Sequence, residues 1–215
     1  MMSSDRKYIY YCNSIDSIQE IEIPETVEYI FNHALSGKKY LKNIFVNSGS
    51  TVYSSLNGVL VSSNLEELIA YPTGRLNESF TIPSEIKIIK EKSIESDNLK
   101  ILVVHDNVTK IEYNALSSIP NLESLTIPFI GTDINSSQKW ISVIFGGGTN
   151  DLNNKGINNG KYLPKNLDTI NITREVLVPE YAFYNASNLQ TIYINSSVTL
   201  NLTLTLKYLS INELI

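Results

Sequence analysis

The sequence LKILVV at residues 99–104 is followed by LESLTI at residues 122–127, so the same spacing of apolar residues returns 23 positions later. The shared pattern is Leu/Ile-x-x-Leu/Ile-x-Val/Ile. Six segments carry it, and they start at Ile18, Leu41, Leu99, Leu122, Leu167 and Leu189, while a degenerate copy starts at Asn77. A repeat of this period is typical of solenoids, in which each turn of the chain stacks on the next.

The spacing of the copies predicts one continuous stack of about seven turns. Successive copies start 23, 36, 22, 23, 45 and 22 residues apart, so the basic period is 22 to 23 residues and two intervals are longer. We expect the stack to form a single domain over residues 1–215. The longer intervals predict two insertions, a β-hairpin at about residues 47–76 and a loop rich in Gly and Asn at residues 129–166.

Each repeat predicts a strand, a turn and a return segment. Side chains alternate along a strand, so Leu102 points into the core while Ile101 and Val103 point outward. In the return segment an apolar residue precedes a small one by four positions, and the small residue lets neighbouring turns approach closely; these residues are Ala34, Ser93, Ala115 and Ala182. The expected fold is therefore a mainly β repeat solenoid with short helical or 3-10 turns.

Composition excludes several classes of protein. The net charge of −5 is spread without runs, whereas a nucleic-acid-binding protein carries a clustered basic stripe. The single Cys12 excludes an internal disulfide framework, and no apolar run has the length of a transmembrane helix. The first residues are too polar for a signal peptide, so we expect the chain to be a fragment of a longer protein, with a cytoplasmic protein as the alternative.

The C-terminal residues suggest that the stack continues. Residues 200–206 alternate at the period of a strand, and the spacing of Leu206, Leu209 and Ile211 predicts a shortened eighth repeat. Solenoids need polar caps to prevent pairing at their ends, and none is evident here. This apolar ending is a second reason to expect a fragment.

No motif predicts a cofactor or a metal site. The three glycines at residues 146–148 lack the Gly-Lys-Ser/Thr ending of a phosphate-binding loop. Residues 151–156 begin like a calcium loop, but Lys155 and Tyr162 occupy positions that need oxygen ligands. His33 and His105 have no Cys or second His at ligand spacing. We therefore expect no catalytic residue, no cofactor and no metal.

The outward-facing strand positions predict a surface for binding a partner. Successive turns about 4.8 Å apart would align these side chains in rows. The candidate residues are Asn43, Phe45, Ile101, Val103, Ser124, Thr126, Thr191 and Tyr193. Four of them are apolar, and an exposed apolar patch indicates an interaction site; the alternative is that an insertion shields them.

Glu20 and Glu22 form the only carboxylate pair on the outward-facing positions. Paired carboxylates are required for glycoside hydrolysis. These two are alternate residues of one edge strand, however, and no cleft wall would bring a sugar between them. A carbohydrate-active enzyme is therefore the weaker alternative.

Three sequence motifs resemble a known family. The first is the sequence pattern Ile-Pro-x-x-Val-x-x-Ile-x-x-x-Ala-Leu at residues 23–35. The second runs from Tyr53 through Asn-Gly-Val-Leu to Tyr-Pro-Thr-Gly at residues 71–74, and the third comprises residues 128–131 and 144–146. Together they are similar to the BspA-like leucine-rich repeats of bacterial and protozoan surface proteins.

This resemblance implies a right-handed leucine-rich solenoid that serves adhesion or protein contact, usually outside the cell, in a family without common catalytic residues. We therefore expect a non-enzymatic binding module at the cell surface or in a secreted protein. Its partner would be a protein, or alternatively a glycan, with no nucleic acid and no membrane insertion. A structural spacer that holds other domains away from the cell is the second hypothesis.

Overall fold

The structure is a computed structural model. It describes residues 3–12, 17–31, 34–136, 139–147, 162–175, 177–178, 182–184, 186–194, 199–200 and 213–214. His33, residues 151–156 and the proposed repeat positions Leu206, Leu209 and Ile211 lie outside the described residues.

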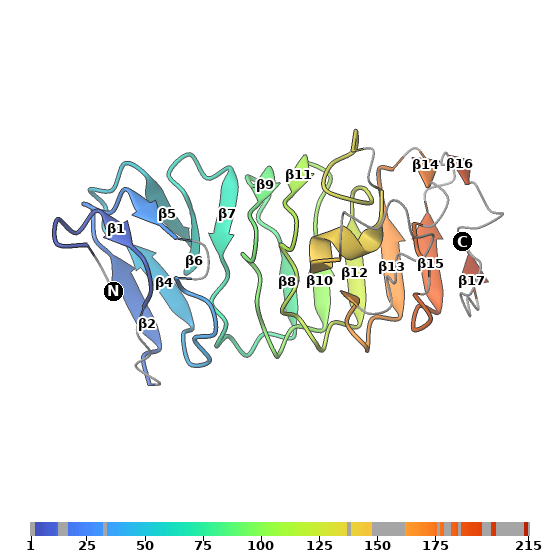
Figure 1. The fold of residues 1–215 in the computed structure, drawn as a ribbon, viewed down its shortest axis with the longest axis horizontal. Coiled ribbons are helices and arrows are strands. Elements are labelled where there is room, and N and C mark those ends of the chain that lie inside the picture. Colours follow the sequence, from blue (N-terminus) through green and yellow to red (C-terminus); the bar gives the residue numbers. More distant parts are fainter. Residues whose placement is uncertain are drawn as a thin grey trace.

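The chain winds into an elongated solenoid whose turns follow one another along its long axis (Figure 1). Six parallel strands, one from each of six turns, form the main sheet: β8 (Ser79–Thr81), β10 (Ile101–Val103), β12 (Ser124–Ile127), β13 (Thr169–Ile172), β15 (Thr191–Ile194) and β17 (Glu213–Leu214). Its central positions are in register, because Leu102 lies opposite Leu125, Leu125 opposite Ile170, and Ile170 opposite Ile192. All four side chains are fully buried.

Short strands on the return side of the turns form a second sheet. Its order is β11 (Lys110–Ile111), β9 (Ile88–Ile89), β7 (Glu67–Ala70), β6 (Val59–Ser62) and β5 (Tyr53–Leu56). Three two-stranded parallel sheets complete the fold, and they pair β1 (Tyr8–Ile9) with β3 (Tyr29–Ile30), β2 (Glu20–Ile23) with β4 (Asn43–Val46), and β14 (Leu177–Val178) with β16 (Thr199–Leu200).

The predicted repeat solenoid of about seven turns is confirmed. The four small residues of the return segments are buried, and each follows the short return strand of its turn, where a larger side chain would hold neighbouring turns apart. Residues 34–41, for which a helical turn was expected, form hydrogen-bonded turns instead. The described part of the chain contains one 3-10 helix of five residues, η1 (Ile141–Phe145).

The main sheet is interrupted between β4 and β8. Ile44 lies opposite Ile21 in the separate β2–β4 sheet, so it does not continue the row of Leu102 and Leu125. At the interruption β5, β6 and β7 form an antiparallel meander, and β6 is buried on both faces. Leu60 packs into the N-terminal hydrophobic cluster, whereas Val59 and Val61 pack into the larger central cluster. Strand β6 therefore divides the core into two parts.

The tight turn between β5 and β6 fastens the two parts together. Asn57 and Gly58 have φ angles of 51° and 76°, the left-handed conformation of a two-residue hairpin turn. The Ile44 N–H donates to the Gly58 carbonyl at 2.9 Å. The Arg75 guanidinium donates to the carbonyls of Lys42 and Asn57, with an Nε–O distance of 2.8 Å for Lys42. A Cβ at position 58 would overlap this arrangement, which explains the glycine.

The described part of the predicted loop, residues 129–136 and 139–147, contains buried residues and a short helix. Phe129, Ile130 and the four apolar residues of η1 are buried in the central cluster. The N–H groups of Asn114 and Leu116 donate to the carbonyls of Val143 and Ile144, so η1 takes the place of a return segment. This excursion is thus built into a turn of the solenoid.

A buried ion pair anchors the same segment. The Lys139 ammonium lies 2.7 Å from the Glu175 carboxylate, and their side chains are 13% and 0% exposed. The Ile130 N–H also donates to Glu175, and Lys139 donates to the Ile134 carbonyl. Glu175 therefore joins Ile130 and Lys139 to the turn that follows β13.

The last described strand corrects the predicted register of the eighth repeat. Strand β17 pairs with β15, and Leu214 lies opposite Ile192. The residue that takes the central position after Ile192, on the next strand of the main sheet, is therefore Leu214, whereas the sequence pattern predicts Leu209. Leu214 comes 22 residues after Ile192, which matches the basic period of the repeat.

Candidate interaction surface

The outward side chains of the main sheet form two rows. The first row contains Ser79, Ile101, Ser124, Thr169 and Thr191, which lie opposite one another on successive strands. The second row contains Thr81, Val103, Thr126, Asn171 and Tyr193. Because successive parallel strands lie about 4.8 Å apart, hydroxyl, amide and apolar groups alternate on a closely spaced grid. We call these two rows the main-sheet face.

The structure brings six of the eight candidate residues together on this face. Ile101 is 44% exposed and Tyr193 is 38% exposed, while the other four are half-buried, namely Val103, Ser124, Thr126 and Thr191. Phe45 is 43% exposed, but it lies with Asn43 on the separate β2–β4 sheet. The Asn43 side chain donates to Glu20 at 2.8 Å and accepts from Arg75 at 3.2 Å. Asn43 therefore takes part in the contacts around the Asn57–Gly58 turn.

The carboxylate pair of the weaker enzymatic hypothesis lies on strand β2. Glu20 and Glu22 are both exposed, and the Glu20 carboxylate accepts the hydrogen bond from Asn43. Neither residue lines a cavity found among the described residues. The geometry therefore offers no described pocket in which these two carboxylates could flank a sugar.

The one described histidine is held by hydrogen bonds. The Asn107 N–H donates to Nδ1 of His105 at 3.1 Å, so Nε2 carries the proton and donates to the Pro83 carbonyl at 2.8 Å. Within the described ranges, no three His, Cys, Asp or Glu side chains are grouped closely enough to hold a metal ion.

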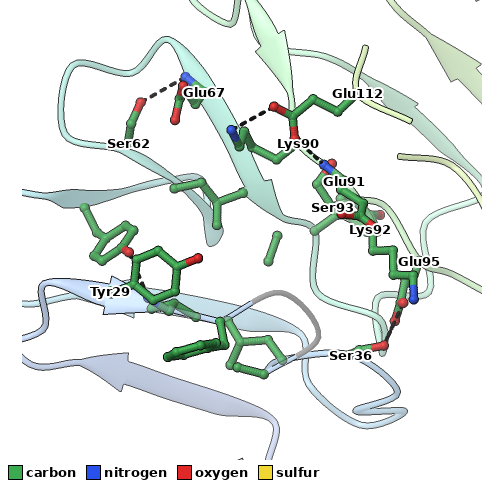
Figure 2. A pocket seen from close by; sticks show the side chains of 18 of the residues that line it. Tyr29, Ser36, Ser62, Glu67, Lys90, Glu91, Lys92, Ser93, Glu95 and Glu112 are labelled. Atoms are coloured by element: carbon green, nitrogen blue, oxygen red, sulfur yellow. Dashed lines mark hydrogen bonds and ion pairs between the residues drawn. The ribbon is translucent and has the colours of Figure 1, made fainter. Parts of the chain in front are cut away.

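A cavity of about 420 Å³ lies where the N-terminal part meets the second sheet (Figure 2). One side is formed by β3 with Phe31 and residues 34–36, and the opposite side by β7 with residues 90–93 and Glu95. We call it the junction cavity. At one end Ser36 Oγ and the Gly37 N–H donate to the Glu95 carboxylate, with Ser36 Oγ–Oε1 and Gly37 N–Oε2 distances of 2.6 and 3.0 Å. Inside, the Tyr53 hydroxyl accepts from the Ile30 N–H at 3.0 Å.

An ion pair between adjacent turns lines the junction cavity. The Lys90 ammonium lies 2.9 Å from Glu112, whose other oxygen accepts the Glu91 N–H at 3.0 Å. Partial burial works to raise the pKa of Glu112, but the hydrogen bonds from Lys90 and the Glu91 N–H outweigh it and hold that pKa below its ordinary value. Partial burial lowers the pKa of Lys90 less than Glu112 raises it, so the net shift is upward. Both groups are therefore charged at neutral pH.

Sequence reasoning did not identify the junction cavity. Its walls come from residues far apart in the chain, such as Tyr29, Glu67 and Glu95. One signal was available, because Lys90 and Glu112 directly follow Ile89 and Ile111, the equivalent return-strand positions of adjacent repeats, and carry opposite charges. Opposite charges at the same repeat position predict an ion pair between turns.

The family model described as BspA type leucine rich repeat region matches residues 6–138 and 152–214, with six copies of the repeat. The chain belongs to this family. The BspA-type resemblance noted in the sequence is thereby confirmed. No curated protein matches the sequence. In the part of the chain that the structure describes, no helix is both long and apolar enough to cross a bilayer.

Three solved structures are similar to this chain. A leucine rich cell surface protein from Faecalibacterium prausnitzii is similar with a TM-score of 0.59 and 23% identity, over 92% of this chain and 48% of that chain. A leucine-rich repeat protein from Eubacterium ventriosum gives 0.45 and 16% identity over 91% and 60% of the two chains, and the pneumococcal vaccine antigen PcpA gives 0.48 and 19% over 92% and 56%. The chain thus spans about half the length of the Faecalibacterium protein.

Proposed function

We propose that the chain is a non-enzymatic binding module of a cell-surface or secreted leucine-rich repeat protein, and that its main-sheet face contacts a partner protein. The observation that carries the proposal is the exposure of Ile101 and Tyr193 among short hydroxyl side chains. Exposing apolar side chains to water is unfavourable, and a face without a binding role would not require them. Binding a partner would remove them from solvent.

The chemistry of the main-sheet face favours a protein over a small molecule. The serine and threonine hydroxyls can donate and accept hydrogen bonds across a broad area. Tyr193 provides a large apolar ring with a polar tip, the kind of residue that is enriched in protein interfaces. The face therefore combines apolar anchors with adaptable polar contacts.

The comparisons support the proposed location and a role in binding. The chain matches BspA type leucine rich repeats, and stacked repeats generate the extended surfaces that solenoids use for binding. The Faecalibacterium protein with the same fold is named a cell surface protein. We infer a similar place for the protein that carries this chain.

The proposal predicts that removing the apolar anchors will weaken binding to the partner. Beads that carry the chain would be tested on an array of immobilised extracellular proteins and glycans. The double variant Ile101→Asp, Tyr193→Ser should bind its protein target at least about tenfold more weakly, because truncating central apolar residues removes most of the binding energy of an interface. The matched control is Tyr40→Ser, Leu76→Asp, which alters two exposed apolar residues outside the face and should bind normally.

Unchanged binding of the Ile101→Asp, Tyr193→Ser variant would contradict the proposal and favour the structural spacer. Binding to glycans alone would contradict the assignment of a protein partner. Circular dichroism of both double variants would verify that each retains its β structure.

A further inference from the structure

We propose that the junction cavity is a second binding site, which receives a Lys or Arg side chain from a segment of a partner protein. The cavity lies on the second sheet, apart from the main-sheet face. This inference therefore goes beyond the proposed function and is tested separately from it.

The charge of the junction cavity favours a cation. Its lining contains two lysines, Lys90 and Lys92, and five glutamates, Glu28, Glu67, Glu91, Glu95 and Glu112. Glu28 pairs with Lys7 and Glu112 also contacts Lys110, and both of these lysines lie outside the lining, so five glutamates meet four lysines and one negative charge remains in excess. A basic side chain that entered the cavity would reduce this excess of negative charge.

Glu67 is the carboxylate available to the incoming group. Its backbone N–H donates to Ser62 Oγ at 2.9 Å, whereas its carboxylate has no hydrogen bond or close ion pair with a described residue and is attracted to Lys90 only at longer range. Figure 2 shows Glu67 near Lys90 and across the cavity from Tyr29. Lys90 already forms an ion pair with Glu112 in the lining of this cavity. The cavity can therefore accommodate an ammonium group beside a carboxylate. A second ammonium or a guanidinium beside Glu67 would have a similar environment.

Aromatic rings at the opening supply the second part of the recognition. Tyr29 and Phe31 line the cavity and are exposed, and their ring centroids lie 4.8 Å apart. Phe31 also contacts Tyr10, which stacks on Tyr8, so an exposed row of four rings leads away from the opening. A cation is attracted to the face of such a ring. The chain itself contains this contact nearby, because the Lys38 ammonium lies 4.6 Å from the centroid of Tyr11.

The size of the junction cavity limits what can enter it. A volume of about 420 Å³ is at the lower end of the range for small-molecule sites, so it suits one long side chain rather than a folded element. The rest of the partner segment would lie over the row of Tyr8, Tyr10 and Phe31. A neutral sugar could stack on these rings but would leave the excess of carboxylates unmatched.

The test is a titration followed by ¹⁵N NMR. The probe is Nα-acetyl-lysine-N-methylamide, and its control is the norleucine analogue, which has the same chain without the ammonium. The lysine compound should shift the amide signals of Tyr29, Glu67 and Lys90 and saturate at millimolar concentration, whereas the norleucine analogue should not. Raising the salt concentration should weaken the binding, because the attraction between charges is screened.

Two matched variants identify the carboxylate. Glu67→Gln should weaken binding of the lysine compound about tenfold, because a charge-assisted hydrogen bond is lost. Glu66→Gln makes the same change one residue earlier, where the side chain pairs with Lys87 on the exposed surface, and should bind like the original protein. Amide signals far from the cavity should stay unchanged in both variants, which verifies the fold.

Three outcomes would overturn the inference. They are equal binding of the norleucine and lysine compounds, equal effects of the Glu66 and Glu67 variants, and selective shifts of the cavity amides by a neutral trisaccharide but not by the lysine compound. None of these outcomes bears on the main-sheet face, so the proposed function is tested independently.

Discussion

Replacing Glu175 with Gln should destabilise the protein by about 3 to 5 kcal/mol, because the Lys139 ammonium would remain buried without its counter-ion. Gln retains the shape of the side chain and an oxygen that can accept the Ile130 N–H, so the change isolates the effect of charge. The measurement is urea-induced unfolding of both proteins at pH 7. Both the carboxylate and the ammonium are almost excluded from water, which is why the expected effect is large.

An exposed ion pair provides the control for Glu175. Glu78→Gln breaks the contact with Lys100, whose N–O distance is 2.9 Å, but both side chains are largely in solvent. Its cost should be far smaller than that of Glu175→Gln, because water screens the exposed charges. Adding Lys139→Met to Glu175→Gln should recover part of the lost stability, since it removes the unpaired charge. Equal costs for the Glu78 and Glu175 variants would show that the buried pair has no special role.

Leu125→Ala should destabilise the protein by about 3 kcal/mol. Leu125 is fully buried and lies between Leu102 and Ile170 on the neighbouring strands, so its truncation leaves a cavity bordered by two adjacent turns. Because each turn of a solenoid is stabilised mainly by its neighbours, this loss weakens the contacts on both sides of β12. Thermal and urea unfolding would measure the effect.

The adjacent residue is the matched control for Leu125. Thr126 lies on the same strand but points outward, so Thr126→Ala should change the stability by no more than about 0.5 kcal/mol. If the two variants lost similar stability, Leu125 would not be an interior position and the assignment of faces would be wrong.

The periodic part of the fold could be predicted from the sequence because it depends on local spacing. Leu102, Leu125 and Ile192 are interior residues in register through Ile170, as the repeat requires. The outward positions of the same strands follow from the alternation of side chains. The repeat therefore determined which six candidate residues would share one face.

Features that depend on the insertions could not be predicted. The interruption between β4 and β8 arises because the β5–β6 turn docks beside Ile44 and is held by Arg75. The turn type was evident from Asn-Gly, but its docking position depends on contacts between distant residues. For this reason Phe45 was placed with Ile101, although it lies on a separate sheet.

The buried polar contacts could not be predicted from the sequence either. Lys139 and Glu175 are 36 residues apart and follow no repeat, so nothing in their spacing indicates a contact. The junction cavity is likewise assembled from residues on both sides of the interruption, including Tyr29 and Glu67. Both features result from the way in which the insertions depart from the repeat.

The most direct test of the proposed function is site-specific photo-crosslinking to the protein partner retained on the array. A benzophenone side chain would be introduced at Thr126, in the middle of the main-sheet face, and in a second protein at Leu177, which is exposed on β14 and lines neither the main-sheet face nor the junction cavity. The account predicts a crosslink from position 126 and none from position 177. A crosslink from position 177 alone would contradict the claim that the main-sheet face is the binding surface.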